Sequence, residues 1–599
     1  MTVKNPLPVP EDVQGYPNND KAVMIYARGK IRVVERQYYW DKQKQRGLEK
    51  RNYLGYVVDN KFYSTESYNE KYKRNGKERL VKQKKTLDSE LSVTNSKAKN
   101  NTCANDLLSS LRAGELPLYY AVAKDLGLVE DLTNVFGKNE ADAILSIAFN
   151  WLSTGDNAAY LFNSWKEDRL LPYTDDLPSK EMSAFLKQLN QTPSWRKNFF
   201  NARLNRLPDD EMLSFDATEI ATAAENIDYA HLGLGKSGGF QKQVGLIILV
   251  GHKTHMPVLF RVLPGNITDV TTVQDMLYRF DEIKDAEQRV FAAVVDRGYF
   301  SLKNLASFID HNSRVIVAAK TEVSWIAKAI DDANSTPWGN AHWIKRKDCW
   351  GKTFPVEKKF EDGQTRKLWV HVYRSEKKNS LELTTFYDAL EKFENDWINW
   401  GKDTTKDHDQ AECPLRKSPM MKYFTKDTGI PGQEAPEQNN DAIDAKVATF
   451  GFFANVTTME CTASDALENY QTRDLIEKTF KAGKSLFDMD IIHSHKSDTM
   501  EGRMIVSFVA LSIINHIYNK MGLETKVELK NGTSKILKPL HQEMSFKELR
   551  NKLSGIRLTN FSDGIRRWTE VTSSQHWIAR RLGYPDLYVD IPTWGEGKK

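Results

Sequence analysis

Residues 212–220 read MLSFDATEI, an apolar segment that turns polar, and they open the series of strands that decides the fold. Two further apolar segments follow, QVGLIILV at 243–250 and MPVLFRVL at 256–263. After an expected helix over 268–285, the nearly all-apolar segment RVFAAVVD at 289–296 has the composition of a buried strand.

A short helix over 301–310 and a fifth strand over 314–320 complete this series. Three consecutive strands followed by a β-α-β unit predict an α/β fold with a ribonuclease H-like mixed sheet covered by helices. In that fold the first and fourth strands are neighbours. Asp216 lies in the first strand and Asp296 ends the fourth, so we expect their carboxylates to lie close together, although Asp also commonly closes strands for structural reasons.

Downstream, four polar residues share one side of a helix predicted over 465–487, with Asp465 as its N-cap: Tyr470, Arg473, Glu477 and Lys484. At roughly 100° per residue they fall within an arc of about 60°. Lys and Arg neutralise phosphate, and a Tyr hydroxyl can donate to its oxygens. A solvated helix face is the alternative reading of the same spacing.

Together with Glu477, the two aspartates could hold two Mg²⁺ ions, or Mn²⁺ in their place, one activating a nucleophile and the other stabilising a leaving oxygen. Neither a Ser-His-Asp motif nor a dinucleotide fingerprint is visible, and GLGKSGG at 233–239 lacks P-loop spacing. His493 and His495 are expected to be surface or phosphate-contacting groups.

Outside these motifs, pattern changes divide the 599 residues into further regions. We predict a β-rich basic region at 1–70, a basic linker at 71–103, a helical and candidate DNA-binding domain at 104–205, a catalytic core at 206–320 and 446–522, a β-rich insertion at 321–445 and a helical C-terminal domain at 523–599.

Composition excludes several classes of protein. The net charge of +5 is small for this length, so the whole-chain charge alone does not indicate a nucleic-acid partner. The four cysteines lie far apart, which argues against a zinc module and a disulfide scaffold. No apolar run approaches the ~18 residues of a membrane span, and the first residues lack a signal-peptide pattern. We expect a soluble protein of the reducing cytoplasm.

Asp216 in SFDATEI, Asp296 in VVDRGYF, the long insertion and the signature at 470–484 together resemble the DDE transposases of bacterial insertion sequences with the Tyr-Arg-Glu-Lys signature. The resemblance covers about 105–520. It implies an enzyme that binds the terminal inverted repeats of its element as a dimer, cleaves double-stranded DNA at the element ends with divalent metal, and joins the freed 3′ hydroxyl to target DNA. Such a protein would work in the bacterial cytoplasm, on the nucleoid.

By this resemblance Asp216, Asp296 and Glu477 are the metal ligands, and Tyr470, Arg473 and Lys484 hold transposon-end phosphates. Cut-and-paste relatives also stack a flipped base on an aromatic ring. Phe453 occupies a comparable position here, with a core phenylalanine on a buried strand as the alternative.

Two other functions remain open. One is a catalytically silent DNA-binding protein descended from a transposase, which the intact carboxylate triad disfavours. The other is a ribonuclease H-like nuclease without strand transfer, which the Tyr-Arg-Lys phosphate clamp disfavours. The terminal repeat, the target site and the pathway of excision are not encoded in any motif we can interpret.

Overall fold

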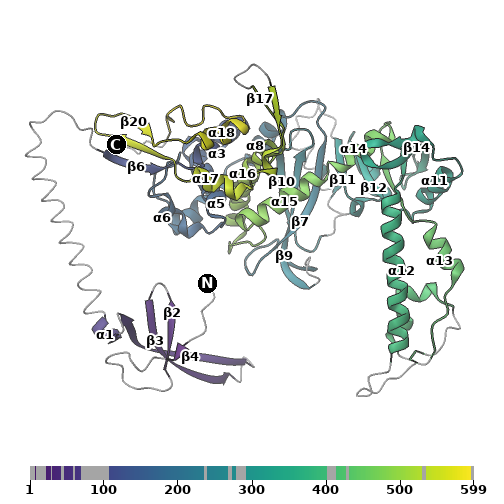
Figure 1. The fold of residues 1–599 in the computed structure, drawn as a ribbon, viewed down its shortest axis with the longest axis horizontal. Helices are drawn as coiled ribbons and strands as arrows, with labels where there is room; N and C mark the ends of the chain where they lie inside the picture. Colours follow the sequence, from purple (N-terminus) through teal and green to yellow (C-terminus); the bar gives the residue numbers. More distant parts are fainter. Residues whose placement is uncertain are drawn as a thin grey trace, which may run out of the picture. The chain divides into compact units, whose positions relative to one another are not determined.

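The structure, a computed structural model, describes residues 7–8, 22–27, 30–41, 46–58, 61–68, 107–234, 239–267, 273–274, 276–277, 292–400, 413–425, 431–432, 434–528 and 534–594. The chain divides into two compact units, residues 1–105 and 106–599 (Figure 1). The predicted basic linker at 71–103 and most of the predicted helix over 268–285 lie outside the described residues.

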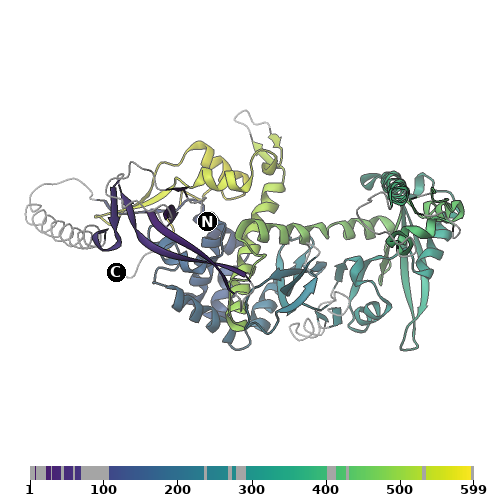
Figure 2. The ribbon, with the colours of Figure 1, turned by 90° about the horizontal axis from the view of Figure 1, so that it is seen from below.

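The first unit contains a five-stranded antiparallel sheet, which confirms the strands predicted near the N-terminus. Its strands, in spatial as in chain order, are β1 (Leu7–Pro8), β2 (Ala22–Ala27), β3 (Lys30–Asp41), β4 (Arg46–Val58) and β5 (Lys61–Ser64). The long antiparallel ribbon of β3 and β4 is drawn in purple in Figure 2. Ala22, Val33 and Val57 are buried and form its small apolar core.

The second unit is built on one ten-stranded mixed sheet with the order β10-β9-β7-β11-β12-β16-β15-β14-β13, and β8 also pairs with β9. Its strands are β7 (Leu213–Ala221), β8 (His231–Leu234), β9 (Phe240–Gly251), β10 (Pro257–Pro264), β11 (Ala292–Val295), β12 (Arg314–Ala319), β13 (Trp343–Ile344), β14 (Cys349–Lys359), β15 (Thr365–Arg374) and β16 (Phe452–Thr457). β7 is antiparallel to β9 and parallel to β11, so the five predicted strands and the predicted neighbourhood of the first and fourth are confirmed.

The described residues of the predicted β-rich insertion at 321–445 do not form a sheet of their own. β15 pairs with β16, and β14 and β13 follow outward, so these strands extend the central sheet. The rest of the region is mainly helical: α11 (Ser324–Asn334), α12 (Glu376–Asn399) and α13 (Asn440–Val447). In Figure 1, α12 and α13 project away from the sheet as an arm. This arm has its own apolar cluster, which includes Phe386, Leu390 and Trp397.

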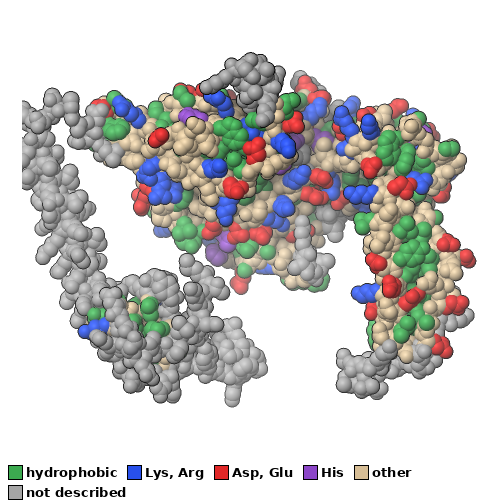
Figure 3. Space-filling model, in the orientation of Figure 1, with side chains coloured by type: hydrophobic (Ala, Val, Ile, Leu, Met, Phe, Trp, Pro, Cys, Tyr) green, Lys and Arg blue, Asp and Glu red, His purple; other side chains and the backbone are tan. Residues whose placement is uncertain are grey.

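On the face drawn in Figure 3, basic and acidic side chains are interspersed over the second unit, and the arm carries apolar side chains flanked by acidic ones. This face therefore does not gather the excess positive charge of the chain into one patch.

Helices cover the sheet, and α3 (Leu116–Asp125), α5 (Lys138–Thr154), α7 (Ser179–Gln191) and α15 (Asp474–Phe487) contact the long buried helix α16 (Ser497–Gly522). Further helices are α4 (Leu128–Phe136), α6 (Phe162–Lys166), α8 (Trp195–Asn205) and α10 (Leu302–Asp310). Of the helices in the described residues, α16 alone is long and apolar enough to cross a membrane, and 89% of its most apolar window is buried within the unit. Burial of this kind is the pattern of a core helix.

The predicted helical C-terminal domain at 523–599 is mixed instead. It contains β17 (Thr525–Glu528), β18 (Ser534–Leu537), α17 (Phe546–Leu553), β19 (Arg557–Phe561), β20 (Arg566–Trp568) and α18 (Ser573–Arg581). β19 pairs with β6 (Leu107–Arg112), a segment also predicted as helical, and with β20. The guanidinium of Arg557 donates to the carbonyl oxygen of Ser110 over 2.6 Å and reinforces this pairing. Both segments are strands because each supplies the backbone hydrogen-bond partners of the other. The sequence pattern within either segment does not contain this information.

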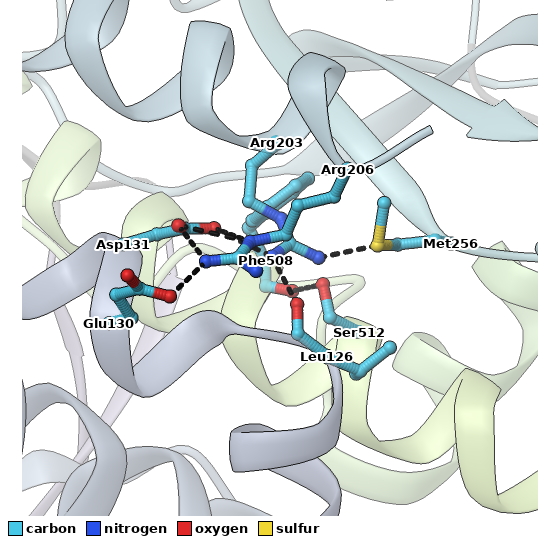
Figure 4. Close-up of polar contacts among 8 residues, drawn as sticks. All are labelled: Leu126, Glu130, Asp131, Arg203, Arg206, Met256, Phe508 and Ser512. Atoms are coloured by element: carbon cyan, nitrogen blue, oxygen red, sulfur yellow. Dashed lines mark hydrogen bonds and ion pairs between the residues drawn. The ribbon is translucent and has the colours of Figure 1, made fainter. Parts of the chain in front are cut away.

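A buried ion-pair network joins α4 and α8 to the edge of the sheet (Figure 4). Arg203, whose side chain is 0% exposed, donates to Asp131 over 2.8 Å and to the sulfur of Met256 over 2.6 Å. Arg206 also donates to Asp131, over 2.6 Å, and to Glu130 over 2.8 Å. Burial lowers the pKa of Arg203, and the hydrogen bond that Arg203 donates to Asp131 opposes that shift. In this network the buried carboxylate of Asp131 therefore balances the fully buried positive charge of Arg203.

His371 in β15 gives the second unit a pH-sensitive position. Its side chain is buried between Thr353 and Thr457, whose hydroxyls lie 2.9 Å from Nδ1 and 3.0 Å from Nε2. Burial lowers the pKa of His371 to about 4. The pKa of His371 in the folded protein lies below its unfolded value of about 6.5. The contribution of the neutral ring to the unfolding free energy is therefore complete above about pH 6.5 and is lost as the pH falls toward 4.

When the pH falls from 7.5 to 5, we expect the shifted pKa of His371 to lower the unfolding free energy of the second unit by about 2 kcal/mol. Urea unfolding at the two pH values should show a smaller loss for His371→Gln than for the wild type. His342→Gln, at an exposed histidine, is the control and should keep the full loss. An equal pH dependence in all three proteins would contradict the assignment.

Candidate active site

The pairing of β7 with β11 brings the two predicted aspartates together on two inner strands of the sheet. Leu213 pairs with Ala293 and Ser214 with Val294, and this register continued by two residues sets Asp216 opposite Asp296. The backbone amide of Ala217 donates to Asp216 over 2.8 Å. Asp296 lies directly after β11 and accepts from the amide of Arg297 over 2.6 Å. Both carboxylates are therefore oriented by their own backbone.

The single helix predicted over 465–487 is two helices, α14 (Ala463–Gln471) and α15 (Asp474–Phe487). The amide of Arg473 bonds to the carbonyl of Tyr470 over 3.1 Å, and the amide of Ile476 bonds to the carbonyl of Arg473 over 3.0 Å. These i to i+3 bonds tighten the chain and break the α-helical ladder. The N-cap prediction is also wrong, because Thr462 caps α14 and accepts from the amide of Asp465.

Apolar packing fixes α15 against the second unit. Ile476 and Phe487 are fully buried and Phe480 is 6% exposed. At Gly483 a Cβ atom would lie 3.0 Å from a methyl carbon of Leu511 in α16, so α15 and α16 approach too closely for a larger residue without a shift. This packing leaves the polar side of α15 facing β7.

Arg473 gathers the three predicted carboxylates. Its Nη1 lies 3.7 Å from Asp216 Oδ2 and 3.6 Å from Asp296 Oδ2, and its Nη2 lies 2.8 Å from Glu477 Oε1. Burial alone would lower the pKa of Arg473, but Tyr470 and these carboxylates raise it overall. The structure thus brings together all three predicted carboxylates, although around a guanidinium.

Tyr470 completes this cluster from α14. Its hydroxyl donates to Asp296 Oδ1 over 3.4 Å, and its ring centre lies 5.9 Å from the guanidinium carbon of Arg473. Burial, together with Asp296, raises the pKa of Tyr470 to about 12. The hydroxyl therefore keeps its proton near neutral pH and remains a hydrogen-bond donor.

Lys484 lies beside the carboxylates and points at β7. Its Nζ donates to Thr218 Oγ1 over 3.0 Å and to the carbonyl of Glu219 over 3.3 Å. A cleft of about 530 Å³ opens here, lined by Asp216, Glu477, Phe480, Lys481, Lys484 and Ser485. Lys481 was missed by the sequence analysis, although its position four residues after Glu477 places it on the same helix face.

The donor set suits a divalent metal ion in its chemical type. Three carboxylates offer the hard oxygen ligands that Mg²⁺ prefers, and all three reach one common cation. Glu477 is 57% exposed in the first turn of α15, so its side chain has room to turn. Within the described parts of the chain, no three acidic, His or Cys side chains already converge as a metal cluster. The residues fit such an ion once Arg473 yields its contacts.

Other predicted residues lie apart from this cluster. Phe453 in β16 is half-buried and stacks on Tyr373, with ring centres 4.8 Å apart and planes inclined by 21°. Its role in base stacking stays a prediction. His493 and His495 line a different cleft, of about 580 Å³, and His493 lies 3.5 Å from a carboxylate oxygen of Asp488.

Carboxylates on adjacent strands, beside a helix that carries a further acid and a lysine, form a ligand set suited to metal-dependent enzymes that act on phosphodiester bonds. The sequence profile described as "Transposase DDE domain" matches residues 208–513, just over half of the chain. This range includes Asp216, Asp296 and the four residues of the signature at 470–484. The chain belongs to the DDE transposase family, whose members normally use divalent metal ions.

The chain is also similar to one chain of a solved structure described as the cryo-EM structure of a piggyBac transposase synaptic complex with hairpin DNA. The similarity covers 83% of this chain and 77% of that chain, with 8% sequence identity and a TM-score of 0.31, values too low to establish a common fold. No curated protein matches the chain.

Proposed function

We propose that this protein is the transposase of a bacterial insertion sequence with the Tyr-Arg-Glu-Lys signature. It binds the terminal inverted repeats of its element, cleaves DNA at the element ends and joins the 3′ hydroxyl ends to target DNA. The observation that carries the proposal is the convergence of Asp216, Asp296 and Glu477 on one guanidinium beside β7 and β11. The strand order β10-β9-β7-β11-β12 supports a ribonuclease H-like core.

In this proposal Asp216, Asp296 and Glu477 hold Mg²⁺ or Mn²⁺. A bound divalent ion supplies Lewis-acid stabilisation of charge on the phosphate oxygens and favours deprotonation of the attacking group. Tyr470 donates a hydrogen bond, and the amino group of Lys484 lies beside the cleft, so the two residues are placed to orient and neutralise a phosphate there.

A transposase has to pair two element ends, so we also propose that the protein acts as a homodimer on double-stranded DNA, in the bacterial cytoplasm. Phe453 is a candidate for stacking a flipped base in that complex. One ring face already lies on Tyr373, so a base would have to use another side of the ring.

The decisive test is incubation of the purified full chain with a labelled duplex that carries the end of its element, in Mg²⁺, in Mn²⁺ and in chelator. We expect strand breakage at the element end with either metal and none in chelator, and joined products when target plasmid is added. A duplex with a scrambled end is the control and should stay intact.

Two other outcomes would identify the competing functions. Breakage without any joined product, at every metal concentration, would indicate a nuclease without strand transfer. Specific binding of the end with no breakage would indicate a DNA-binding protein that has lost catalysis.

A further inference from the structure

Arg473 contacts the same three carboxylates that the proposed function assigns to metal. We propose that Arg473 is the internal counter-ion of this triad in the DNA-free protein, and that it moves to a DNA phosphate when an element end binds, so that metal loading is coupled to DNA binding. This inference rests on the proposed function and adds a regulatory step to the same site.

The first reason is charge. Without a nearby cation, the carboxylates of Asp216, Asp296 and Glu477 would repel one another. A guanidinium keeps its charge at any physiological pH and offers five donors in a planar fork. Arg473 uses Nη1 toward both aspartates and Nη2 toward Glu477, and its side chain is only 14% exposed. The guanidinium is therefore placed among the acids and is not simply a surface charge.

The second reason is competition for the same oxygens. A divalent ion needs carboxylate oxygens, and Arg473 lies 2.8 Å from the nearest one, on Glu477. Binding of the ion consequently requires Arg473 to give up at least part of these contacts. Metal affinity in the DNA-free protein should be reduced by the free energy of those contacts.

The third reason is the alternative partner. Guanidinium binds phosphate in two-point geometry, as it binds carboxylate. Arg473 lies in the turn just before α15, where the exposed amides of a helix N-terminus favour an anion. A DNA phosphate at the cleft can therefore accept the guanidinium and leave the carboxylates to the metal.

Linkage makes the coupling reciprocal. If DNA tightens metal binding by some factor, metal must tighten DNA binding by the same factor, typically ~5- to 150-fold. Removal of Arg473 should raise metal affinity without DNA and abolish most of this coupling.

The experiment measures Mn²⁺ binding to the full chain by electron paramagnetic resonance, first without DNA. We expect Arg473→Gln to bind Mn²⁺ about 10-fold more tightly than the wild type. Lys481→Gln removes the same charge from the same cleft, has no role in holding the triad, and should change the affinity less than about 3-fold. Equal tightening in both variants would mean a general electrostatic effect and would overturn the proposal.

The second arm adds a duplex carrying the element end and a 3′-dideoxy terminus, which prevents joining. DNA should tighten Mn²⁺ binding by the wild type and have little effect on Arg473→Gln. If Arg473→Gln does not fold, Arg473→Lys keeps the charge with fewer donors. It should bind Mn²⁺ more tightly than the wild type, and wild-type affinity in that variant would contradict the inference.

These measurements separate the two proposals. If the wild type binds neither Mn²⁺ nor the duplex under any condition, the proposed function fails. If the wild type binds both but DNA leaves its Mn²⁺ affinity unchanged, the inference about Arg473 fails and the proposed function stands.

Discussion

Glu477→Gln should abolish strand breakage at the element end and leave DNA binding intact. The substitution preserves the size of the side chain and an oxygen that can accept from Arg473, but it removes the negative charge that a divalent ion needs. We expect a fall of about 10³-fold in the cleavage rate, which corresponds to ~4 kcal/mol of transition-state stabilisation. Cleavage rates on the end-bearing duplex and fluorescence anisotropy at fixed salt would measure the two properties.

Asp474→Asn is the matched control, because Asp474 is an exposed acid in the same first turn of α15. Its cleavage rate should remain within about 3-fold of the wild type, as a surface charge contributes little. Wild-type cleavage by Glu477→Gln would show that the carboxylate triad is assigned wrongly, although the family membership would stand.

Asp131→Ala should destabilise the second unit by about 3 to 5 kcal/mol, because it leaves a buried guanidinium without its carboxylate. The side chains of Arg203 and Asp131 are 0% and 4% exposed, so water cannot replace the lost partner without local opening. Urea unfolding monitored by tryptophan fluorescence would measure the loss, since Trp195 in α8 is buried nearby in sequence and fold.

Glu130→Ala is the comparison for this network. Glu130 pairs with Arg206 over 2.8 Å, but its side chain is 69% exposed, so we expect a loss below about 1 kcal/mol. Similar losses in the two variants would mean that burial of Asp131 and Arg203 does not set the cost.

The strands that carry the aspartates could be predicted because their signal is local. MLSFDATEI begins apolar and turns polar, and β7, which carries Asp216, lies in it. RVFAAVVD is nearly all apolar, which suits a strand covered on both faces, and β11, which directly precedes Asp296, lies in it. The placement of Asp216 and Asp296 on neighbouring strands then followed from the order of strands and helices. Tyr470, Arg473 and Glu477 were selected correctly as a cluster, although on a helix that is in fact interrupted.

The features that could not be predicted depend on contacts between distant segments. β15 joins the central sheet because β16 offers it a free edge, and GIRL at 555–558 contributes to a strand because β6 lies beside it. The interruption at Arg473 leaves no trace in the spacing of polar residues. The encirclement of that guanidinium by three acids is visible only after β7, β11 and α15 are packed.

The pairing of β6 with β19 has a consequence for the newly made protein. Arg112 leaves the ribosome long before its partner Arg557 is translated, and at roughly 5 to 20 residues per second this gap lasts tens of seconds. During that interval the backbone groups of β6 that later pair with β19 are without this partner and can meet chaperones and other nascent chains. The helices that follow β6 can thus form early, whereas completion of this sheet is deferred until β19 has been translated.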